Sequence, residues 1–145
     1  MKTLVMILIL GAVSPALAAD VTVEMLNNKD GQMYVYSTNI VNVEVGDTVT
    51  WKSTNPGHNA VFIPKAFPDG AAPLNGMLNK DVSYKFEKPG IYMIKCTPHY
   101  GMGMIQAIVV GKDKSNLEQV KAVSYPGKAK AQADAIFAEL SKVSY

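Results

Sequence analysis

The amino-acid sequence predicts a mainly β protein, in which a sandwich of about eight short strands is followed by two helices. Short segments with β-branched and aromatic residues recur along most of the chain, and turns rich in glycine, proline and asparagine separate them. After residue 114 the spacing of apolar residues changes to that of an amphipathic helix. We therefore expect a single domain over residues 19–145, whose helical extension covers about residues 115–143.

The first eighteen residues have the features of a secretory signal peptide. Lys2 gives a positive start, an apolar run covers residues 4–13, and the tripeptide Ala16–Ala18 has small residues at both outer positions. A retained membrane anchor is the alternative, but the run is shorter than the roughly 20 residues that span a bilayer. We expect residues 1–18 to be removed by cleavage after Ala18. The mature protein would then be exported, with no membrane segment.

The expected strands follow one another along the chain, and each ends at a turn or a loop. Alternating or β-branched and aromatic residues predict strands at 21–25, 33–36, 40–45, 48–52, 58–63, 82–86, 90–95 and 105–110. Turns are predicted where glycine stands beside asparagine, aspartate or proline, at 27–31, 46–47, 54–57 and 87–90. Residues 64–78 contain three prolines and are predicted to form a loop.

Two helices are predicted after the last strand. The segment Ser115–Glu118 has the pattern of a capping box, in which serine and glutamate side chains accept hydrogen bonds from exposed backbone N–H groups. Tyr125–Gly127 would end the first helix, because proline and glycine disfavour helix interiors. Apolar residues of the second helix recur on one face, which we expect to pack on the sandwich: Ala129, Ala133, Ile136, Phe137 and Leu140.

Charge and cysteine content exclude some classes of function. The formal net charge is +2, and loss of Lys2 with the signal peptide leaves +1, so the chain has no basic character that would indicate nucleic-acid binding. All fourteen basic residues are lysines, which suit electrostatically guided encounters better than bidentate binding. Cys96 is the only cysteine, so an internal disulfide is excluded. Its thiol is left for an intermolecular bridge, a reaction or a metal.

One loop carries most of the residues with metal-binding chemistry. Cys96, His99, Met102 and Met104 lie between two predicted strands, and the other histidine, His58, follows a Pro-Gly turn. Two histidines, a cysteine and a weak axial methionine are the ligand set of a blue-copper electron-transfer site. Copper is favoured over zinc, since a neutral thioether is a poor ligand for zinc. The sequence therefore predicts one copper ion per chain, which alternates between Cu(I) and Cu(II).

The expected strand geometry supports this site. Side chains alternate between the two faces of a strand, so Tyr92, Ile94 and Cys96 would point to one face. Met93 and Lys95 would point to the other face. Cys96 would then face the interior at the point where its strand leaves the sheet, and the following loop would return His99 to the same place.

Each of these residues also has an ordinary explanation. A lone cysteine is often buried and inert, a histidine after a turn can belong to the loop alone, and methionines fill gaps in cores. A cysteine-nucleophile enzyme is a second alternative, but no carboxylate or amide is obviously placed to orient a histidine base. A periplasmic copper storage or delivery module is the third, for which the pair Met102 and Met104 is the only hint. The coincidence of all the ligand types favours an electron carrier and not an enzyme.

The pattern His58…Cys96-x-x-His99-x-x-x-x-Met104 resembles that of the cupredoxins, and the resemblance covers essentially the whole mature chain, including the two C-terminal helices. It implies an eight-stranded Greek-key β-sandwich and a type 1 copper protein that carries single electrons in the periplasm. It also implies a monomeric carrier, whose redox partners, such as nitrite reductase or cytochromes, dock transiently near His99.

Cupredoxins differ in whether the axial methionine lies three or five residues after the loop histidine, which leaves Met102 and Met104 as candidates. The branch with a loop and helices like these implies Met104, and the glycines on either side of Met102 permit a tight turn that exposes it. The resemblance also implies that Asn59 supports the site through its backbone N–H and its side chain. Pro98 has no N–H to donate to the cysteine sulfur.

We expect the partner surface to be an apolar patch around His99, formed by Pro98, Met102 and Met33, inside a ring of lysines. The candidates are Lys29, Lys65, Lys80 and Lys95, each of which is explained as well by ordinary solvation. A ring of this kind would guide an acidic partner, so that the association rate falls as the salt concentration rises.

Overall fold

A computed structural model describes residues 16–145, so that most of the expected signal peptide lies outside the described residues. The elements follow in the order β1 Asp20–Lys29, β2 Gln32–Tyr36, β3 Ile40–Val43, β4 Thr48–Lys52, β5 Val61–Phe62, β6 Val82–Lys85, β7 Gly90–Lys95, the 3-10 helix η1 Tyr100–Met102, β8 Ile105–Val110, α1 Leu117–Lys121 and α2 Lys128–Lys142. The protein is mainly β with two C-terminal helices, which confirms the predicted fold class. Within the described range, no helix has both the length and the apolar character needed to cross a membrane.

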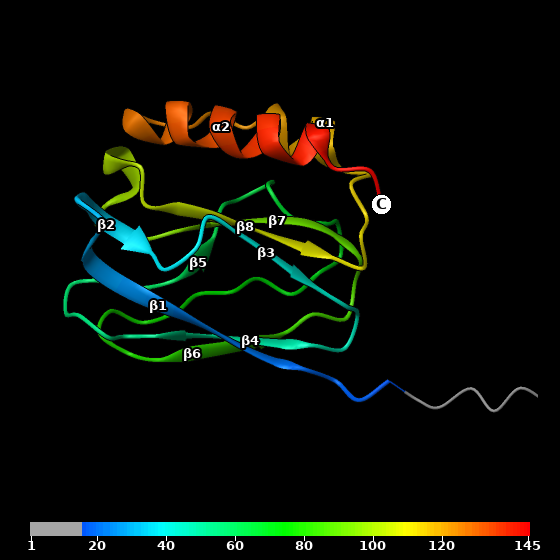
Figure 1. The fold of residues 1–145 in the computed structure, drawn as a ribbon, viewed down its shortest axis with the longest axis horizontal. Helices are drawn as coiled ribbons and strands as arrows, with labels where there is room; N and C mark the ends of the chain where they lie inside the picture. Colours follow the sequence, from blue (N-terminus) through cyan, green and yellow to red (C-terminus); the bar gives the residue numbers. More distant parts are fainter. Residues whose placement is uncertain (1–15) are drawn as a thin grey trace, which may run out of the picture.

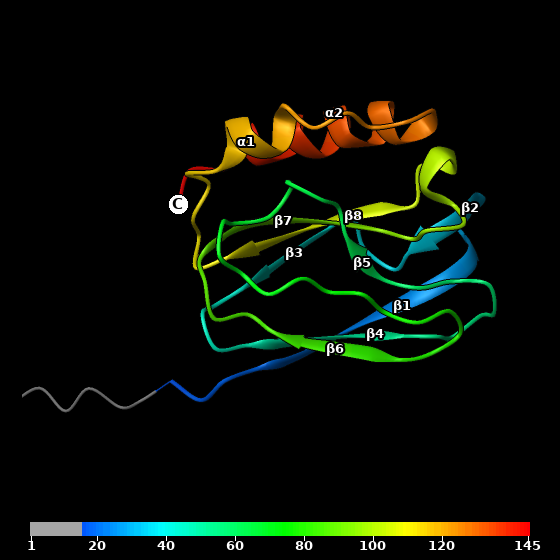
Figure 2. The ribbon, with the colours of Figure 1, turned by 180° about the vertical axis from the view of Figure 1, so that it is seen from behind.

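The strands form two four-stranded sheets, and the helices add a third layer (Figure 1). The first sheet has the order β2-β1-β4-β6, and the second has the order β3-β8-β7-β5. β1 pairs in parallel with β4, and β3 with β8, while the remaining neighbours are antiparallel. Both helices lie on the outer face of the second sheet, as the view from behind also shows (Figure 2). The second sheet is therefore covered on both faces.

Burial follows from this layering. All six residues of β8 and five of the six residues of β7 are buried. Tyr92, Ile94 and Cys96 belong to the core between the sheets, whereas Ile91 and Met93 belong to the core under the helices. The predicted alternation along this strand is therefore confirmed. Burying a large aliphatic side chain contributes about 1.5–3 kcal/mol, so the strand that carries the cysteine is firmly anchored on both faces.

The second helix packs through the face that the sequence predicts. The buried residues of α2 are Ala129, Ala133, Ile136, Phe137 and Leu140. Gly127, which precedes this helix, has a positive φ of 53° and approaches the loop after β7. A Cβ atom at Gly127 would lie only 2.5 Å from the carbonyl oxygen of Gly101. The start of α2 is therefore held against the loop that carries the predicted metal ligands.

The expected capping box at Ser115–Glu118 is wrong. The N-cap of α1 is Asn116, and no side chain caps this helix. The Asn116 amide instead binds the backbone of β7: Oδ1 accepts a hydrogen bond from the Ile91 N–H at 2.8 Å, and Nδ2 donates to the Ile91 carbonyl at 2.9 Å. The asparagine thus joins the helix to the strand, which is a tertiary role that a local pattern does not reveal.

The first hairpin is longer than the sequence predicts. β1 continues to Lys29, so the turn expected at 27–31 narrows to Asp30–Gly31. Both turn residues have positive φ, at 51° and 84°, which is the geometry of a two-residue hairpin turn. The asparagines before the turn, which suggested a loop, belong to the strand, and one of them, Asn27, contacts His58.

The strand expected at 58–63 is shorter than predicted, since β5 covers only Val61–Phe62. The segment before β5 is bonded to a loop and not to a strand. The Asn79 N–H donates a hydrogen bond to the His58 carbonyl at 2.9 Å. His58 therefore lies on the connection from β4 in the first sheet to β5 in the second.

We predict that Asn116→Ala lowers the free energy of unfolding by about 1–3 kcal/mol, because it leaves the N–H and C=O of the buried residue Ile91 without their partners. Urea unfolding followed by tryptophan fluorescence measures the change. Ser115→Ala is the matched control and should change the stability by no more than about 0.5 kcal/mol. A larger loss in Ser115→Ala than in Asn116→Ala would restore the capping box.

Candidate metal centre

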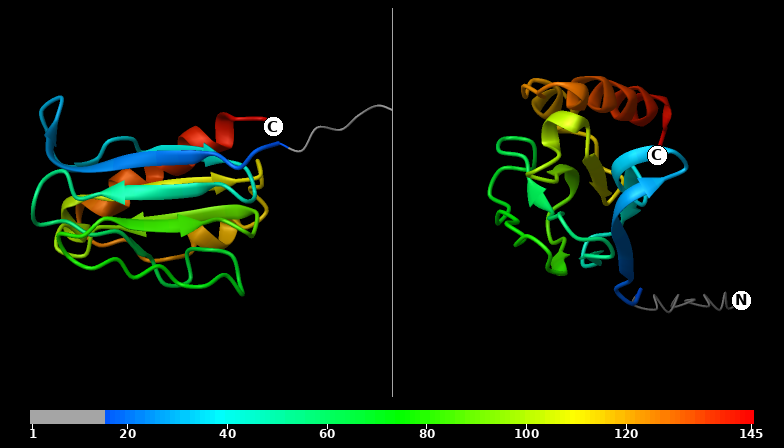
Figure 3. Two further views of the ribbon diagram at one scale, coloured as in Figure 1. Left: turned by 90° about the horizontal axis from the view of Figure 1, so that it is seen from below. Right: turned by 90° about the vertical axis from the view of Figure 1, so that its left-hand side faces the viewer.

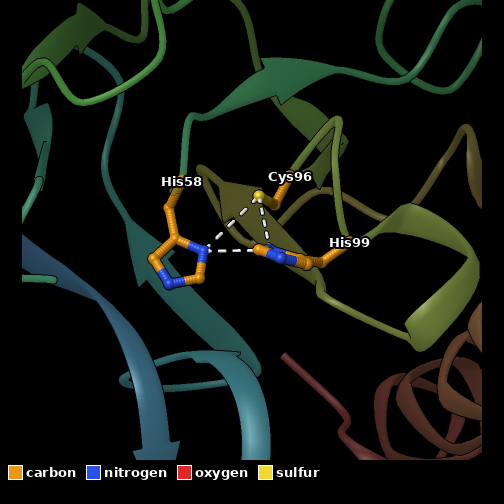
Figure 4. Close-up of side chains that lie close together, drawn as sticks. All are labelled: His58, Cys96 and His99. Carbon is orange, nitrogen blue, oxygen red and sulfur yellow. Dashed lines mark hydrogen bonds between the residues drawn. The ribbon is translucent and has the colours of Figure 1, made fainter. Parts of the chain in front are cut away.

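Three residues with metal-binding side chains meet at one end of the sandwich (Figure 4). His58 comes from the connection between β4 and β5, Cys96 directly follows β7, and His99 lies in the loop before η1. His58 and Cys96 are completely buried, and His99 is partly exposed. The right-hand view of Figure 3 looks onto this end of the molecule. The fold thus brings three of the four predicted ligands together from two separate segments.

The three ligand atoms form a compact triangle. His58 Nδ1 lies 3.1 Å from His99 Nδ1, and Cys96 Sγ lies 3.7 Å from the first nitrogen and 3.5 Å from the second. In a triangle with these edges the point equidistant from the corners lies roughly 2 Å from each, close to the length of a metal–nitrogen bond. One metal ion can therefore contact all three atoms without a change in fold. Two imidazoles and a thiolate are the trigonal ligands of a blue-copper centre.

Backbone hydrogen bonds tie the ligand loop to itself. The Cys96 N–H donates to the Met104 carbonyl at 3.0 Å, and the Met104 N–H donates to the His99 carbonyl at 3.2 Å. Gly103 closes the turn with a φ of 94°, in the left-handed region that glycine adopts readily. The Met104 side chain is 1 % exposed and lies in the same core as Cys96, whereas Met102 is 54 % exposed. Of the two candidate methionines, Met104 is the one enclosed by the protein.

The surroundings favour neutral imidazoles and make the thiol difficult to ionise without a cation. Burial lowers the pKa of His58, and the nearby His99 lowers it further, while burial also lowers the pKa of His99. Burial raises the pKa of the Cys96 thiol, although hydrogen bonds from the backbone N–H groups of Asn59 and His99 act in the opposite direction. A metal requires neutral imidazoles and a thiolate. The charge of a bound cation would offset the cost of a buried thiolate.

Asn59 connects the two segments that carry the ligands. Its Oδ1 accepts a hydrogen bond from the Thr97 N–H at 2.7 Å, and its Nδ2 donates to the Thr97 Oγ1 at 3.2 Å. The buried Tyr36 hydroxyl donates to the Asn59 carbonyl at 2.9 Å and fixes the backbone there. The residue after His58 is thus held against the residue after Cys96, so the Asn59 side chain braces the two ligand segments against each other.

A second supporting residue, Asn27, is not apparent from the sequence. Its Oδ1 lies 2.8 Å from His58 Nε2. Because an amide oxygen only accepts hydrogen bonds, His58 carries its hydrogen on Nε2 and leaves Nδ1 free for a metal. The Asn27 N–H donates in turn to Asn55 Oδ1 at 2.8 Å, which joins β1 to the connection before His58. The structure thus identifies Asn27 as the residue that fixes the orientation of the His58 ring.

Tyr34 is the other residue at the centre that the sequence does not single out. Its ring stacks on the His99 ring, with centroids 4.0 Å apart and an angle of 0° between the planes. The Tyr34 backbone has a φ of 56°, which is uncommon for a residue other than glycine and persists only where the surroundings hold it. Tyr34 therefore covers one face of the only ligand in the triangle that reaches the surface, and it limits the rotation of that ring.

The remaining predicted residues lie on the surface around the centre. Pro98 is exposed, and it has no N–H for the sulfur. Met33 and Met102 are both more than half exposed and line one groove between the β1–β2 hairpin and the start of α2. Lys128 lines the same groove. It was not among the predicted lysines, because the sequence does not show that α2 begins beside η1.

The predicted lysines lie on several elements. Lys29 ends β1, Lys95 ends β7, and Lys80 follows the loop residue that bonds to the His58 carbonyl. These three therefore lie on segments that also carry or contact the ligands. Lys65 lies beside α1, whose Gln119 side chain donates a hydrogen bond to the Lys65 carbonyl at 3.2 Å.

Known proteins resemble this chain in sequence and in fold. Residues 23–111 match the family described as copper binding proteins, plastocyanin/azurin family. The pseudoazurin of Methylorubrum extorquens is 37 % identical over 126 residues, which cover 87 % of this chain and 85 % of that protein. The pseudoazurin of Paracoccus pantotrophus is 32 % identical over 133 residues, which cover 92 % of each chain. The solved structure of a pseudoazurin from Sinorhizobium meliloti has a TM-score of 0.83 and 43 % identity, and the match covers 86 % of this chain and 98 % of that one.

The chain therefore belongs to the plastocyanin/azurin family of copper-binding proteins. Within the family it is similar to the pseudoazurins over most of its length, as the Cys96–Met104 loop and the two C-terminal helices lead us to expect. Members of this family are electron carriers and not enzymes, so the protein is a type 1 copper electron carrier that binds one copper ion. The donor atoms found in the triangle fit this metal.

We predict that Asn27→Ala weakens copper binding by about 10–100-fold, because the His58 ring loses the hydrogen bond that orients it. Competition for Cu(I) with a chelator of known affinity measures the change. Asn28→Ala is the matched control, since the Asn28 side chain contacts Met33 Sδ and not a histidine. Equal copper affinities in the two variants would contradict the role of Asn27.

Proposed function

We propose that this protein is a periplasmic carrier that donates single electrons to a denitrification enzyme such as nitrite reductase. The proposed copper ligands are His58, Cys96, His99 and Met104. The observation that carries the proposal is the triangle of two imidazole nitrogens and a sulfur, with two corners buried and one at the surface. The proposed acceptor follows from the resemblance of the ligand loop to that of cupredoxins with such partners.

The residues around the triangle suit a carrier that changes little between two oxidation states. Copper, when bound, supplies the one-electron couple. Asn27 orients the His58 ring, and Asn59 joins the two ligand segments, so that each ligand is held from outside the site. Connected hydrogen bonds of this kind make a site rigid. Electrons would leave through His99, because the other two corners of the triangle have no exposed surface.

Export is the second part of the proposal. It is supported by the charge and apolar pattern of residues 1–18 and by the small residues before the proposed cleavage point after Ala18. The first strand begins at Asp20, so the proposed mature chain over residues 19–145 would start directly at the sandwich. The mature protein would act as a monomer in the periplasm.

Copper storage or delivery is the alternative function. Met33 and Met102 present exposed thioethers to one groove, and thioethers are soft ligands suited to Cu(I). Complete burial of His58 and Cys96 favours a fixed ion over an exchanging one. The electron carrier is therefore the better supported function.

Addition of Cu(II) to the metal-free protein should produce an intense visible thiolate-to-copper band and a narrow EPR hyperfine splitting. Cys96→Ser should abolish both, since a hydroxyl cannot replace the thiolate. Met104→Leu should change the spectrum, whereas Met102→Leu, the matched control, should leave it unchanged because the Met102 side chain is more than half exposed.

Two other outcomes of this titration would contradict the proposal. A pale complex that loses copper readily would favour storage or delivery. A spectrum that changes in Met102→Leu and not in Met104→Leu would assign the axial position to Met102.

The proposed docking surface surrounds His99. Its centre is apolar, with Pro98, Met33 and Met102 exposed there, and an apolar centre of this kind excludes water from a contact. The lysines proposed to guide a partner are Lys29, Lys65, Lys80 and Lys95, and we also propose Lys128, which lines the same groove as Met33 and Met102. Charged groups around an apolar centre raise the rate of encounter more than they raise the final affinity.

The rate at which purified nitrite reductase oxidises the reduced protein should fall on the order of tenfold or more as the ionic strength rises from about 0.01 M to about 1 M. Stopped-flow absorbance measures this rate. Lys80→Gln and Lys128→Gln should each weaken the salt dependence, because each removes one guiding charge. Lys142→Gln, at the far end of α2, should not. A rate independent of salt would contradict the lysine ring.

A further inference from the structure

A buried carboxylate lies at the opposite end of the sandwich from the metal centre. Asp47, in the turn between β3 and β4, is the one aspartate, glutamate or lysine among residues 16–145 that is buried, with 8 % of its surface exposed. The ion pairs found in this part of the chain do not include it. Burying an ionised carboxylate is costly unless hydrogen bonds and a positive charge compensate for it. The described side chains provide Asp47 with no such charge.

Two backbone N–H groups bind this carboxylate. Oδ1 accepts a hydrogen bond from the Ala19 N–H at 2.7 Å, and Oδ2 accepts one from the Glu44 N–H at 2.8 Å. The Ala19 carbonyl accepts a hydrogen bond from the Thr48 N–H at 3.0 Å, so Ala19 is held on both sides at the start of β4. Ala19 is also the residue that follows the proposed cleavage point. In the unprocessed chain its nitrogen belongs to a neutral peptide bond.

We infer that removal of the signal peptide creates an ion pair between the new α-ammonium group of Ala19 and the carboxylate of Asp47. Hydrolysis of the Ala18–Ala19 bond consumes one water molecule, leaves a carboxylate on Ala18 and leaves an amine on Ala19. An α-amine is mostly protonated at neutral pH, since its ordinary pKa is about 7.7–8.0. The nitrogen already lies 2.7 Å from Asp47 Oδ1, so the pair forms without rearrangement. The inference rests on the proposed cleavage after Ala18 and is independent of copper.

The ion pair would fasten one end of β1. This strand pairs in parallel with β4 from Asp20 opposite Thr48 onward, and at its other end Asn27 binds His58. Figure 1 shows the start of β1 at the lower right, away from η1 and β2 at the left. A charge-assisted hydrogen bond is roughly twice as strong as a neutral one. Part of the stability of the mature protein is therefore absent while the signal peptide is attached.

A double-mutant cycle tests the charge separately from the hydrogen bond. The chain that starts at Ala19 is compared with the same chain acetylated at Ala19, because acetylation keeps the N–H but removes the charge. In the copper-loaded protein, acetylation should lower the folding equilibrium constant by about tenfold when Asp47 is present. In the Asp47→Asn background, acetylation should have little effect. Urea unfolding measures the four constants, and an unchanged copper band shows that the distant site is intact.

Three outcomes would overturn the inference. The first is an equal effect of acetylation in the chain with Asp47 and in the Asp47→Asn variant. The second is that acetylation does not change the stability of the chain with Asp47. If Asp47→Asn does not fold, the comparison of the acetylated and unacetylated chains with Asp47 tests the ion pair by itself. The third is an intact mass, for the protein purified from the periplasm, that corresponds to a chain starting at a residue other than Ala19.

Discussion

The convergence of a sulfur and two imidazole nitrogens within hydrogen-bond distance of one another is the constraint on which the rest of this structure depends. Each donor belongs to a segment that the fold fixes for another reason. Cys96 continues a strand that is buried on both faces, and the loop after it is closed by backbone hydrogen bonds to Met104. His58 lies on a connection between the two sheets. A change in how the sheets pack would therefore separate the ligands.

The first strand, β1, runs from the buried Asp47 at one end of the sandwich to the metal centre at the other. At one end, Asn27 orients the His58 ring, and at the other, Ala19 meets the buried Asp47. A strand with parallel pairing to β4 along five residue pairs has little freedom to slide. The orientation of the buried histidine is therefore set by a strand that contains no ligand, and the proposed processing of the N-terminus would act on that same strand.

The sequence predicts those features that depend on local periodicity or on a rare set of residue types. The buried face of α2 and the alternation of Tyr92, Ile94 and Cys96 follow from residue spacing alone. The role of Asn27 does not, because an asparagine near a glycine is typical of a turn, and its partner is 31 residues away. The capping box at Ser115–Glu118 is wrong for a related reason. The N-cap is Asn116, and its side chain binds Ile91 in β7, which is distant in the sequence.

The three corners of the triangle differ in burial, so only one of them reaches the surface. Two corners of the triangle have no exposed surface, and two asparagines fix the segments around them, the exposed Asn27 through the His58 ring and the buried Asn59 through Thr97. The third corner, His99, reaches the surface, but Tyr34 stacks on one face of its ring. The exposed ligand is thus open to a partner while its orientation is still constrained. Burial of two corners favours retention of the metal, and exposure of the third shortens the path of an electron to a docked protein, so unequal burial suits a carrier of single electrons.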